Sequence, residues 1–169
     1  MGLLEEIHAE RTPNLDQVTK IYIETGPVAF SSAGIQKPEL GVEGKFSLWF
    51  LAALALAEGK VSLDKFTDQK VQDPGLQKLL SKVDAHLVRE RKFGALVQVH
   101  LADGQKIEKS REHPKGSPEN PLSFEEIEDK FSSTAAPHLS EKRAQGLIEQ
   151  VRGLDQIMDA SALARSLSS

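Results

Sequence analysis

The sequence predicts an α+β protein in which a small antiparallel sheet packs with helices and one apolar helix is fully buried. Several short segments alternate apolar and polar residues, as half-buried strands do. The stretch from Lys45 to Glu58 is apolar on nearly every face, so a helix there must be buried on every face. Strands and helices do not alternate regularly, which favours α+β over a parallel α/β sheet.

The first elements are a short helix and a strand. Leu3 to Glu10 has its apolar residues on one helical face, and Val18 to Thr25 has Ile21 and Ile23 on one face of a strand. The segment from Val28 to Gly44 is rich in Gly, Ser and Pro and predicts a long loop.

The apolar helix is expected to begin at Lys45 and to end at the C-cap residue Gly59. Its burial is possible within one domain, but it also suits a helix between two domains. After it, Ser62 to Leu80 predicts short helical turns broken at Asp73-Pro74, because proline disfavours a helical residue before it.

Three further strands are expected, at Val83–Val88, Ala95–Leu101 and Lys106–Arg111. The last two form a hairpin with the three-residue loop Ala102-Asp103-Gly104, in which the glycine adopts a left-handed conformation. Pairing Leu101 with Ile107 keeps the apolar residues of both strands on one face.

The C-terminal part predicts three helices. Ser123 and Glu126 form a capping box for a helix through about Ser132. Two more helices follow, from Ser140 to Arg152 and from about Ala160 to Leu167.

The composition narrows the class of protein. The 169 residues contain no cysteine, which excludes disulfides, a thiolate nucleophile and cysteine-ligated metals. The net charge of −4 and the scattered basic residues do not suit a nucleic-acid partner. No apolar run reaches the length needed to span a membrane, so no membrane partner is expected. The N-terminus does not have the pattern of a signal peptide, and we expect a cytoplasmic protein.

The common cofactor and metal motifs are missing from the sequence. It has no glycine-rich nucleotide fingerprint, no phosphate-binding loop and no zinc-protease motif, and we expect no cofactor. The five histidines do not have metal-ligand spacing. His86 and His100 could meet across the sheet, but surface histidines on strands are the simpler interpretation, so no metal site is predicted.

Lys45 is the first candidate for substrate binding. At the start of a buried helix its ammonium can hold a carboxylate, and the nearby helix N-terminal amides, including those after Gly44, would favour an anion. The alternative is a surface lysine whose stem covers Phe46 and Trp49.

Arg111, His113 and Lys115 are the other substrate-binding candidates. They lie in one turn-rich stretch, and a molecule with several carboxylates needs several positive partners. His113 can also exchange protons near neutral pH. The alternative is a solvated loop whose prolines only set a rigid path. No residue is identified as catalytic.

Two segments carry a resemblance to a known family. They are GVEGKFSLWFLAALALAEGK, from Gly41 to Lys60, and REHPKGSPENPLSFEEIEDKF, from Arg111 to Phe131. In this order they resemble the C-terminal lid domain of the MmgE/PrpD family, which includes enzymes such as 2-methylcitrate dehydratase, and the similarity extends over residues 1–169.

The resemblance implies a lid domain of a homodimeric, cofactor-independent lyase or isomerase that acts on small polycarboxylic acids by dehydration, decarboxylation or epimerisation. Most catalytic residues of the family belong to a helical domain that no segment here matches. The resemblance places Phe50 where the family commonly has an active-site tyrosine, so the role of that hydroxyl does not carry over.

We therefore expect an excised or split lid domain that is inactive alone and works with the family's helical domain in cis or trans. Two alternatives remain open. The chain could be a non-catalytic interaction or self-association module, with an apolar patch exposed over the Lys45 to Glu58 helix. It could also be a stand-alone carboxylate-binding domain.

Overall fold

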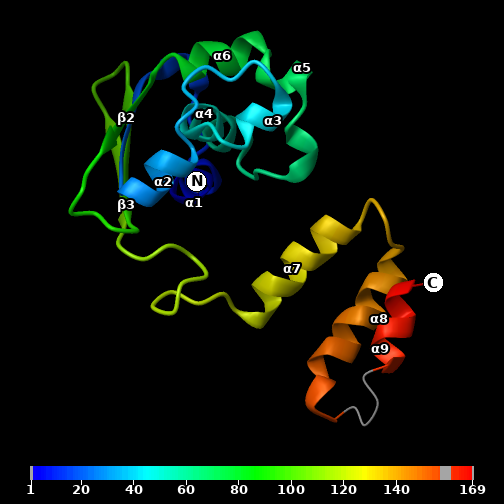
Figure 1. Cartoon of the computed structure of the whole chain (residues 1–169). Helices are drawn as coiled ribbons and strands as arrows, with labels where there is room; N and C mark the ends of the chain where they lie inside the picture. The colour runs from blue at the N-terminus through cyan, green and yellow to red at the C-terminus, as the bar shows by residue number, and fades with distance from the viewer. Residues whose placement is uncertain (1, 157–160, 169) are drawn as a thin grey trace. The chain divides into compact units, whose positions relative to one another are not determined.

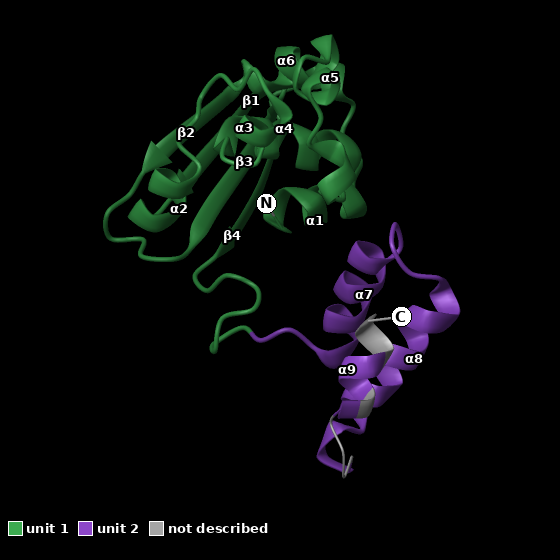
Figure 2. Cartoon of the chain, turned by 45° about the vertical axis from the view of Figure 1, so that its right-hand side comes forward, with its two compact units in different colours: residues 1–120 green, residues 121–169 purple. Residues whose placement is uncertain are grey.

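The computed structural model describes residues 2–156 and 161–168, and the chain divides into two compact units, residues 1–120 and 121–169 (Figures 1 and 2). Within its described residues, the first unit contains a four-stranded sheet and six α-helices. These helices are α1 (Gly2–Glu10), α2 (Pro27–Ser32), α3 (Gly41–Gly44), α4 (Leu48–Glu58), α5 (Asp68–Val71) and α6 (Pro74–Leu80). Sheet and helices together confirm the predicted α+β class.

The sheet has the strand order β2-β1-β3-β4. Its strands are β1 (Val18–Thr25), β2 (Val83–Leu87), β3 (Ala95–Leu101) and β4 (Lys106–Arg111), all within one residue of the predicted ranges. Three of the strands form antiparallel pairs, as the predicted small antiparallel sheet requires, whereas β2 runs parallel to β1. The long connection through α2–α6 allows this crossover.

The β3–β4 hairpin has the predicted loop but a different register. The Leu101 N–H donates to the Gln105 oxygen at 2.9 Å, and Gly104 has a φ of 83°, which confirms the three-residue loop with a left-handed glycine. Ile107 lies opposite Val99, so its predicted pairing with Leu101 is wrong by two residues. A shift of two keeps every side chain on its face, and the apolar side of the hairpin still faces the core.

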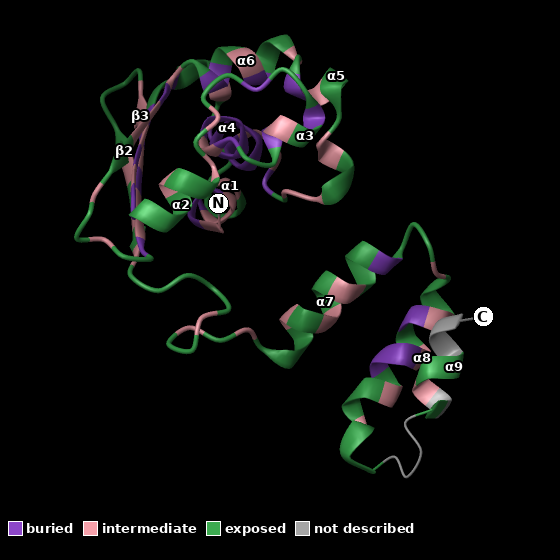
Figure 3. Ribbon diagram, viewed as in Figure 1, coloured by how far each residue is buried: buried purple, intermediate pink, exposed green. Residues whose placement is uncertain are grey.

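Helix α4 is the centre of the core. Every residue from Trp49 to Leu56 is at most 8% exposed, and α1, α6 and the sheet pack around the helix (Figure 3). Full burial is therefore confirmed, and it is achieved inside the first unit. An exposed apolar patch was expected over this helix. For residues 49–56 that expectation is wrong, because other elements of the first unit cover them.

The start of α4 differs from the prediction. The helix begins at Leu48 rather than at Lys45, because the hydroxyl of Ser47 accepts the Phe50 N–H at 3.0 Å and acts as the N-cap. The other end is as predicted: Gly59, with a φ of 75°, is the C-cap residue.

The segment predicted as a loop from Val28 to Gly44 contains two short helices. Pro27 is the first residue of α2, a position where its missing N–H costs no hydrogen bond. A side chain from another element fixes the start of helix α3: the Gly41 N–H donates to the Asp68 carboxylate of α5 at 2.7 Å.

The second unit contains α7 (Phe124–Ala135), α8 (Glu141–Arg152) and α9 (Ser161–Ser168). The predicted capping box is confirmed, with the Ser123 N–H donating to Glu126 at 2.8 Å, and α7 extends three residues beyond Ser132. The predicted start of the last helix at Ala160 lies outside the described residues. Within the described ranges, none of the helices is long and apolar enough to cross a membrane.

An ion-pair cluster fixes the segment that follows α4. Glu58 pairs with Lys65 at 2.8 Å and with Lys70. Burial by itself would raise the pKa of Glu58, but the two ammonium groups outweigh it and hold the pKa below its usual value. The cluster therefore stabilises the fold above the unfolded pKa of the carboxyl group, and this stability is lost as the pH falls through the folded pKa.

We predict that Leu54→Ala lowers the free energy of unfolding by about 2–5 kcal/mol, because it leaves a cavity beside a fully buried helix. Leu54 is 0% exposed, whereas Leu63, at 66%, is a matched control whose change to alanine should have little effect. Urea denaturation measures both, and equal losses would contradict the assignment of α4 to the core.

We predict that Glu58→Gln destabilises the first unit by about 0.5–1 kcal/mol at pH 7, because the ion pairs are lost while the shape is kept. The difference from the natural protein should vanish in acid, where Glu58 is also protonated. Urea titrations at several pH values measure this. Glu90→Gln is the control, since no ion pair involves Glu90 among the residues that the structure describes. A pH-independent difference for Glu58→Gln would contradict the prediction.

Candidate functional site

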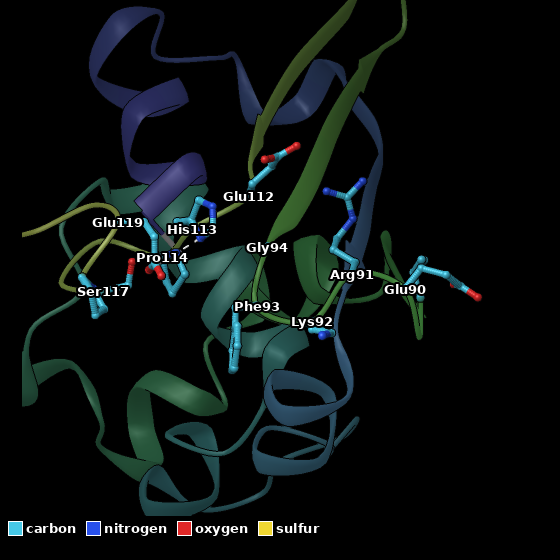
Figure 4. A pocket seen from close by; sticks show the side chains of 12 residues that line it. Glu90, Arg91, Lys92, Phe93, Gly94, Glu112, His113, Pro114, Ser117 and Glu119 are labelled. Atoms are coloured by element: carbon cyan, nitrogen blue, oxygen red, sulfur yellow. Dashed lines mark ion pairs between the residues drawn. The ribbon is translucent and has the colours of Figure 1, made fainter.

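A hollow of about 800 Å³ opens at one end of the sheet (Figure 4). Residues 88–94, which connect β2 to β3, and residues 112–119, which follow β4, form its walls. The apolar part of the lining consists of Val88, Phe93, Pro114 and Pro118, and the charged part consists of Glu90, Arg91, Lys92, Glu112, His113 and Glu119. Its volume lies in the range typical of small-molecule sites.

Two glycines allow the backbone segments around the hollow to approach one another. A Cβ at Gly26 would overlap the carbonyl of Arg91, and a Cβ at Gly94 would lie 2.5 Å from the carbonyl oxygen of Arg111. A side chain at either position would push a connecting segment outward. The shape of the hollow therefore depends on glycine at both sites.

The segment after β4 is folded into a hydrogen-bonded turn. The Gly116 N–H donates to the Asn120 oxygen at 2.8 Å, with Gly116 at a φ of 91°. The Asn120 side chain in turn donates to the His113 oxygen at 3.1 Å. These bonds fix the backbone that carries His113.

His113 and Glu119 form an acid–base pair on one wall of the hollow. The His113 Nδ1 lies 3.7 Å from a Glu119 carboxylate oxygen, and both side chains are about half exposed (Figure 4). The Glu119 N–H, and to a smaller degree His113, hold the pKa of the Glu119 carboxyl below its usual value. At 3.7 Å the two groups do not form a hydrogen bond, and the imidazole on this wall remains accessible to a ligand.

The other predicted substrate-binding residues do not line the hollow. Arg111, at the end of β4, forms an ion pair with Glu6 of α1. Lys115 is exposed on the turn after β4. The structure thus brings Arg111, His113 and Lys115 to one end of the sheet, but only His113 faces the hollow.

Lys45 lies elsewhere, in the turn between α3 and α4. Its side chain is exposed, and its Nζ lies 5.7 Å from the centre of the Phe66 ring. The predicted alternative had the stem over Phe46 and Trp49, but the aromatic partner of the ammonium is Phe66. The ring of Phe50 is fully buried and lies 6.3 Å from that of Phe66.

Three backbone amides near Lys45 donate to acceptors within the fold. The Phe46 N–H donates to Glu43 at 2.9 Å, the Leu48 N–H donates to Ala33 at 2.8 Å, and the Ser47 hydroxyl accepts the Phe50 N–H. These three amides are therefore occupied within the fold, whereas the ammonium of Lys45 is exposed.

Sequence reasoning missed the 88–94 wall of the hollow. Arg91 and Lys92 belong to a basic run, Arg89 to Lys92, between two predicted strands, and this run was the signal that could have indicated a functional loop. The guanidinium of Arg91 also lies 3.4 Å from Glu24 on β1.

The two strand histidines do not meet. His86 on β2 pairs with Asp84 at 2.7 Å, His100 is on β3, and β1 lies between these strands. In the part of the chain that the structure describes, no group of three potential metal-ligating side chains comes together.

Comparison with known proteins identifies relatives. The family model for the MmgE/PrpD C-terminal domain matches residues 2–156. Human cis-aconitate decarboxylase is 28% identical over 130 residues, which cover 74% of this chain and 27% of the relative. The cis-aconitate decarboxylase of Aspergillus terreus is 25% identical over 166 residues, covering 92% of this chain and 34% of the relative. The chain thus spans about a third of these relatives or less.

We predict that Gly94→Ala disturbs the hollow and lowers the free energy of unfolding by about 1–3 kcal/mol, because the new Cβ meets two backbone carbonyls. Amide shifts in residues 111–119 should change in NMR spectra. Gly75→Ala, whose Cβ would meet mainly the side chain of Asp73, is the control and should cost much less. Unchanged shifts at residues 111–119 would contradict the role given to Gly94.

Proposed function

Because the chain belongs to the MmgE/PrpD family, we propose that it is the C-terminal domain of a lyase or isomerase that acts on small polycarboxylic acids. The match over residues 2–156 carries this proposal. The relatives named cis-aconitate decarboxylase support a tricarboxylic acid of that kind as the substrate.

Lys45 and His113 are the substrate-binding residues that the geometry favours. The ammonium of Lys45 is exposed and has no acidic partner within the described ranges, so a substrate carboxylate can take that place. His113, on the wall of the hollow, can hold a second carboxylate or move a proton.

Arg111 and Lys115 remain part of the proposal on the same segment as His113. Arg111 already neutralises Glu6, and this ion pair attaches α1 to the end of β4. Its contact with a substrate would have to compete with that pairing, so we assign Arg111 a weaker part in binding than His113.

The 169-residue chain by itself should have little or no turnover. Proton removal next to a carboxylate needs a base, an acid and several cations in one place, whereas Lys45 does not line the hollow that holds His113. We propose that the helical domain of the family, in cis or in trans, supplies the remaining groups. A cytoplasmic homodimer that needs no cofactor is part of the same proposal.

One observation favours a second candidate, a carboxylate-binding domain that acts alone. The hollow has a ligand-sized volume and is lined by both basic and apolar side chains. Three glutamates also line it, and they oppose the binding of a polyanion. We therefore rank this candidate second.

We predict that the chain alone does not convert cis-aconitate, 2-methylcitrate or citrate, and that Lys45→Ala behaves the same. Chromatography of the reaction mixtures measures substrate and product. Turnover that grows with the concentration of the chain and disappears in Lys45→Ala would contradict the proposal, since the chain would then carry a complete site.

The same samples separate the two candidates. Saturable binding of citrate to the isolated chain, seen by calorimetry and lost in His113→Ala, would favour the carboxylate-binding domain. Lys60→Ala is the matched control, because it removes an exposed cation outside the hollow.

A further inference from the structure

Strand β2 forms one edge of the four-stranded sheet (Figure 2). Its strand neighbour is β1, and within the described ranges no second strand pairs with its other side. An edge of this kind presents unpaired backbone groups that can pair with another chain. The direction of the backbone groups and the order of the side chains along β2 indicate which chain fits there.

The backbone groups of β2 alternate between β1 and the open side. The Ile21 N–H of β1 donates to the Lys82 oxygen at 2.9 Å, just before β2 begins. The bonds of a parallel ladder involve every second residue of a strand, so Asp84 and His86 also direct their backbone groups to β1. The other residues of β2 direct their N–H and C=O groups away from the sheet, and we call them the free edge of β2: Val83, Ala85 and Leu87.

The side chains of β2 separate into an apolar face and a polar face. Val83 and Ala85 lie on the face that packs towards the core, and Leu87 continues this face but is 42% exposed. Asp84 and His86 lie on the opposite face, with side chains that are 42% and 48% exposed. A carboxylate and an imidazole therefore stand two positions apart, on either side of Ala85.

This order makes β2 complementary to itself. In an antiparallel pair with a two-fold axis at Ala85, Asp84 of each copy lies opposite His86 of the other, and Val83 lies opposite Leu87. A carboxylate facing an imidazole is a favourable cross-strand pair, whereas like charges that face one another are unfavourable. An axis at Asp84 would place two carboxylates opposite each other, and an axis at His86 would place two imidazoles opposite each other.

The backbone fits the same register. With the axis at Ala85, every residue of the free edge lies opposite another residue whose backbone groups also point outward. Each of these opposed pairs can exchange two N–H···O bonds, as hydrogen-bonded pairs of antiparallel strands do. The exposed side chain of Leu87 also gains Val83 of the second copy as an apolar neighbour. Because both copies use the same surface, the contact closes as a dimer and does not continue into a fibre.

We propose that the free edge of β2 binds the same edge of a second copy of this chain, antiparallel and with the two-fold axis at Ala85. The two sheets then form one continuous sheet. The inference rests on the homodimer that is part of the proposed function, and it names the surface that joins the two copies. Lys45 and His113, the substrate-binding residues of that proposal, do not belong to β2 and stay free for a ligand.

Hydrogen exchange at several concentrations of the chain tests the pairing, with NMR spectroscopy as the site-by-site readout. We expect the amides of the free edge to exchange about tenfold or more slowly at high concentration than at low concentration, since they are bonded only in the dimer. The amides of Asp84 and His86 are the internal control, because they are bonded to β1 at every concentration.

Proline variants test the edge by the mass that sedimentation measures, with 18.5 kDa as the mass of one chain. Ala85→Pro removes an N–H that points away from β1, so the fold should persist while the dimer dissociates. Ser110→Pro is the matched control on β4, the other edge of the sheet. The bond from the Leu101 N–H to Gln105 and the β3–β4 register show that the Ser110 N–H also points outward. This control should remain dimeric.

A pair of charge variants tests the register. Asp84→Lys places a lysine opposite His86, and His86→Asp places a second carboxylate opposite Asp84, so each variant alone should dimerise about tenfold or more weakly. In an equimolar mixture the introduced lysine lies opposite the introduced aspartate, and the remaining Asp84 lies opposite the remaining His86. The mixture should therefore regain the association of the natural chain.

A natural chain that is monomeric at every concentration overturns the proposal. A dimer that persists in Ala85→Pro, or that leaves exchange at the free edge unchanged, also overturns it, while the homodimer of the proposed function still stands. If circular dichroism shows Ala85→Pro to be unfolded, the mixture of charge variants decides, and a mixture that stays monomeric counts against β2. None of these measurements depends on turnover, so the activity assays judge the proposed chemistry separately.

Discussion

The first unit depends on the burial of α4. A helix with apolar residues on all sides has no stable place at a surface, so other elements must enclose it. The sheet supplies one wall through the apolar face of its strands, and α1 and α6 supply others. Helix α4 is also part of the connection between β1 and β2, and this connection is long enough for the parallel pairing of the two strands.

Each end of α4 is fixed by a polar contact that the core cannot provide. Ser47, itself fully buried, caps the first turn. At the other end the Leu56 carbonyl accepts a hydrogen bond from the His8 ring at 2.8 Å, and Glu58 forms ion pairs with Lys65 and Lys70. These contacts position the segments on either side of the helix.

Much of this fold could be predicted from the sequence, and the failures have physical reasons. The strands were found because period-two alternation reports directly which face is buried. The direction of β2 was missed because alternation is the same for a parallel and an antiparallel neighbour. The start of α4 was placed three residues early because Lys45 and Phe46 are compatible with a helix, and the competing bond between the Leu48 N–H and the Ala33 oxygen is not local.

The candidate site was harder to predict, because the spacing of residues in the sequence does not show which partners their side chains contact. Arg111 and His113 are two residues apart, yet an ion pair with Glu6 on α1 occupies the arginine while the histidine faces the hollow. Arg91 and Lys92 come near His113 only because Gly94 lets two backbone segments approach. Such approaches depend on tertiary packing.

The segment from Lys45 to Phe50 shows how one motif can serve two purposes. Ser47 and Phe50 face inward and are fully buried, whereas Lys45 and Phe46 face outward and are exposed. A tyrosine in place of Phe50 would bring a hydroxyl into a fully buried position whose ring lies 6.3 Å from that of Phe66. From this segment, chemistry with an external molecule is open first to the ammonium of Lys45. In the proposed function, the remaining groups for such chemistry come from the helical domain of the family.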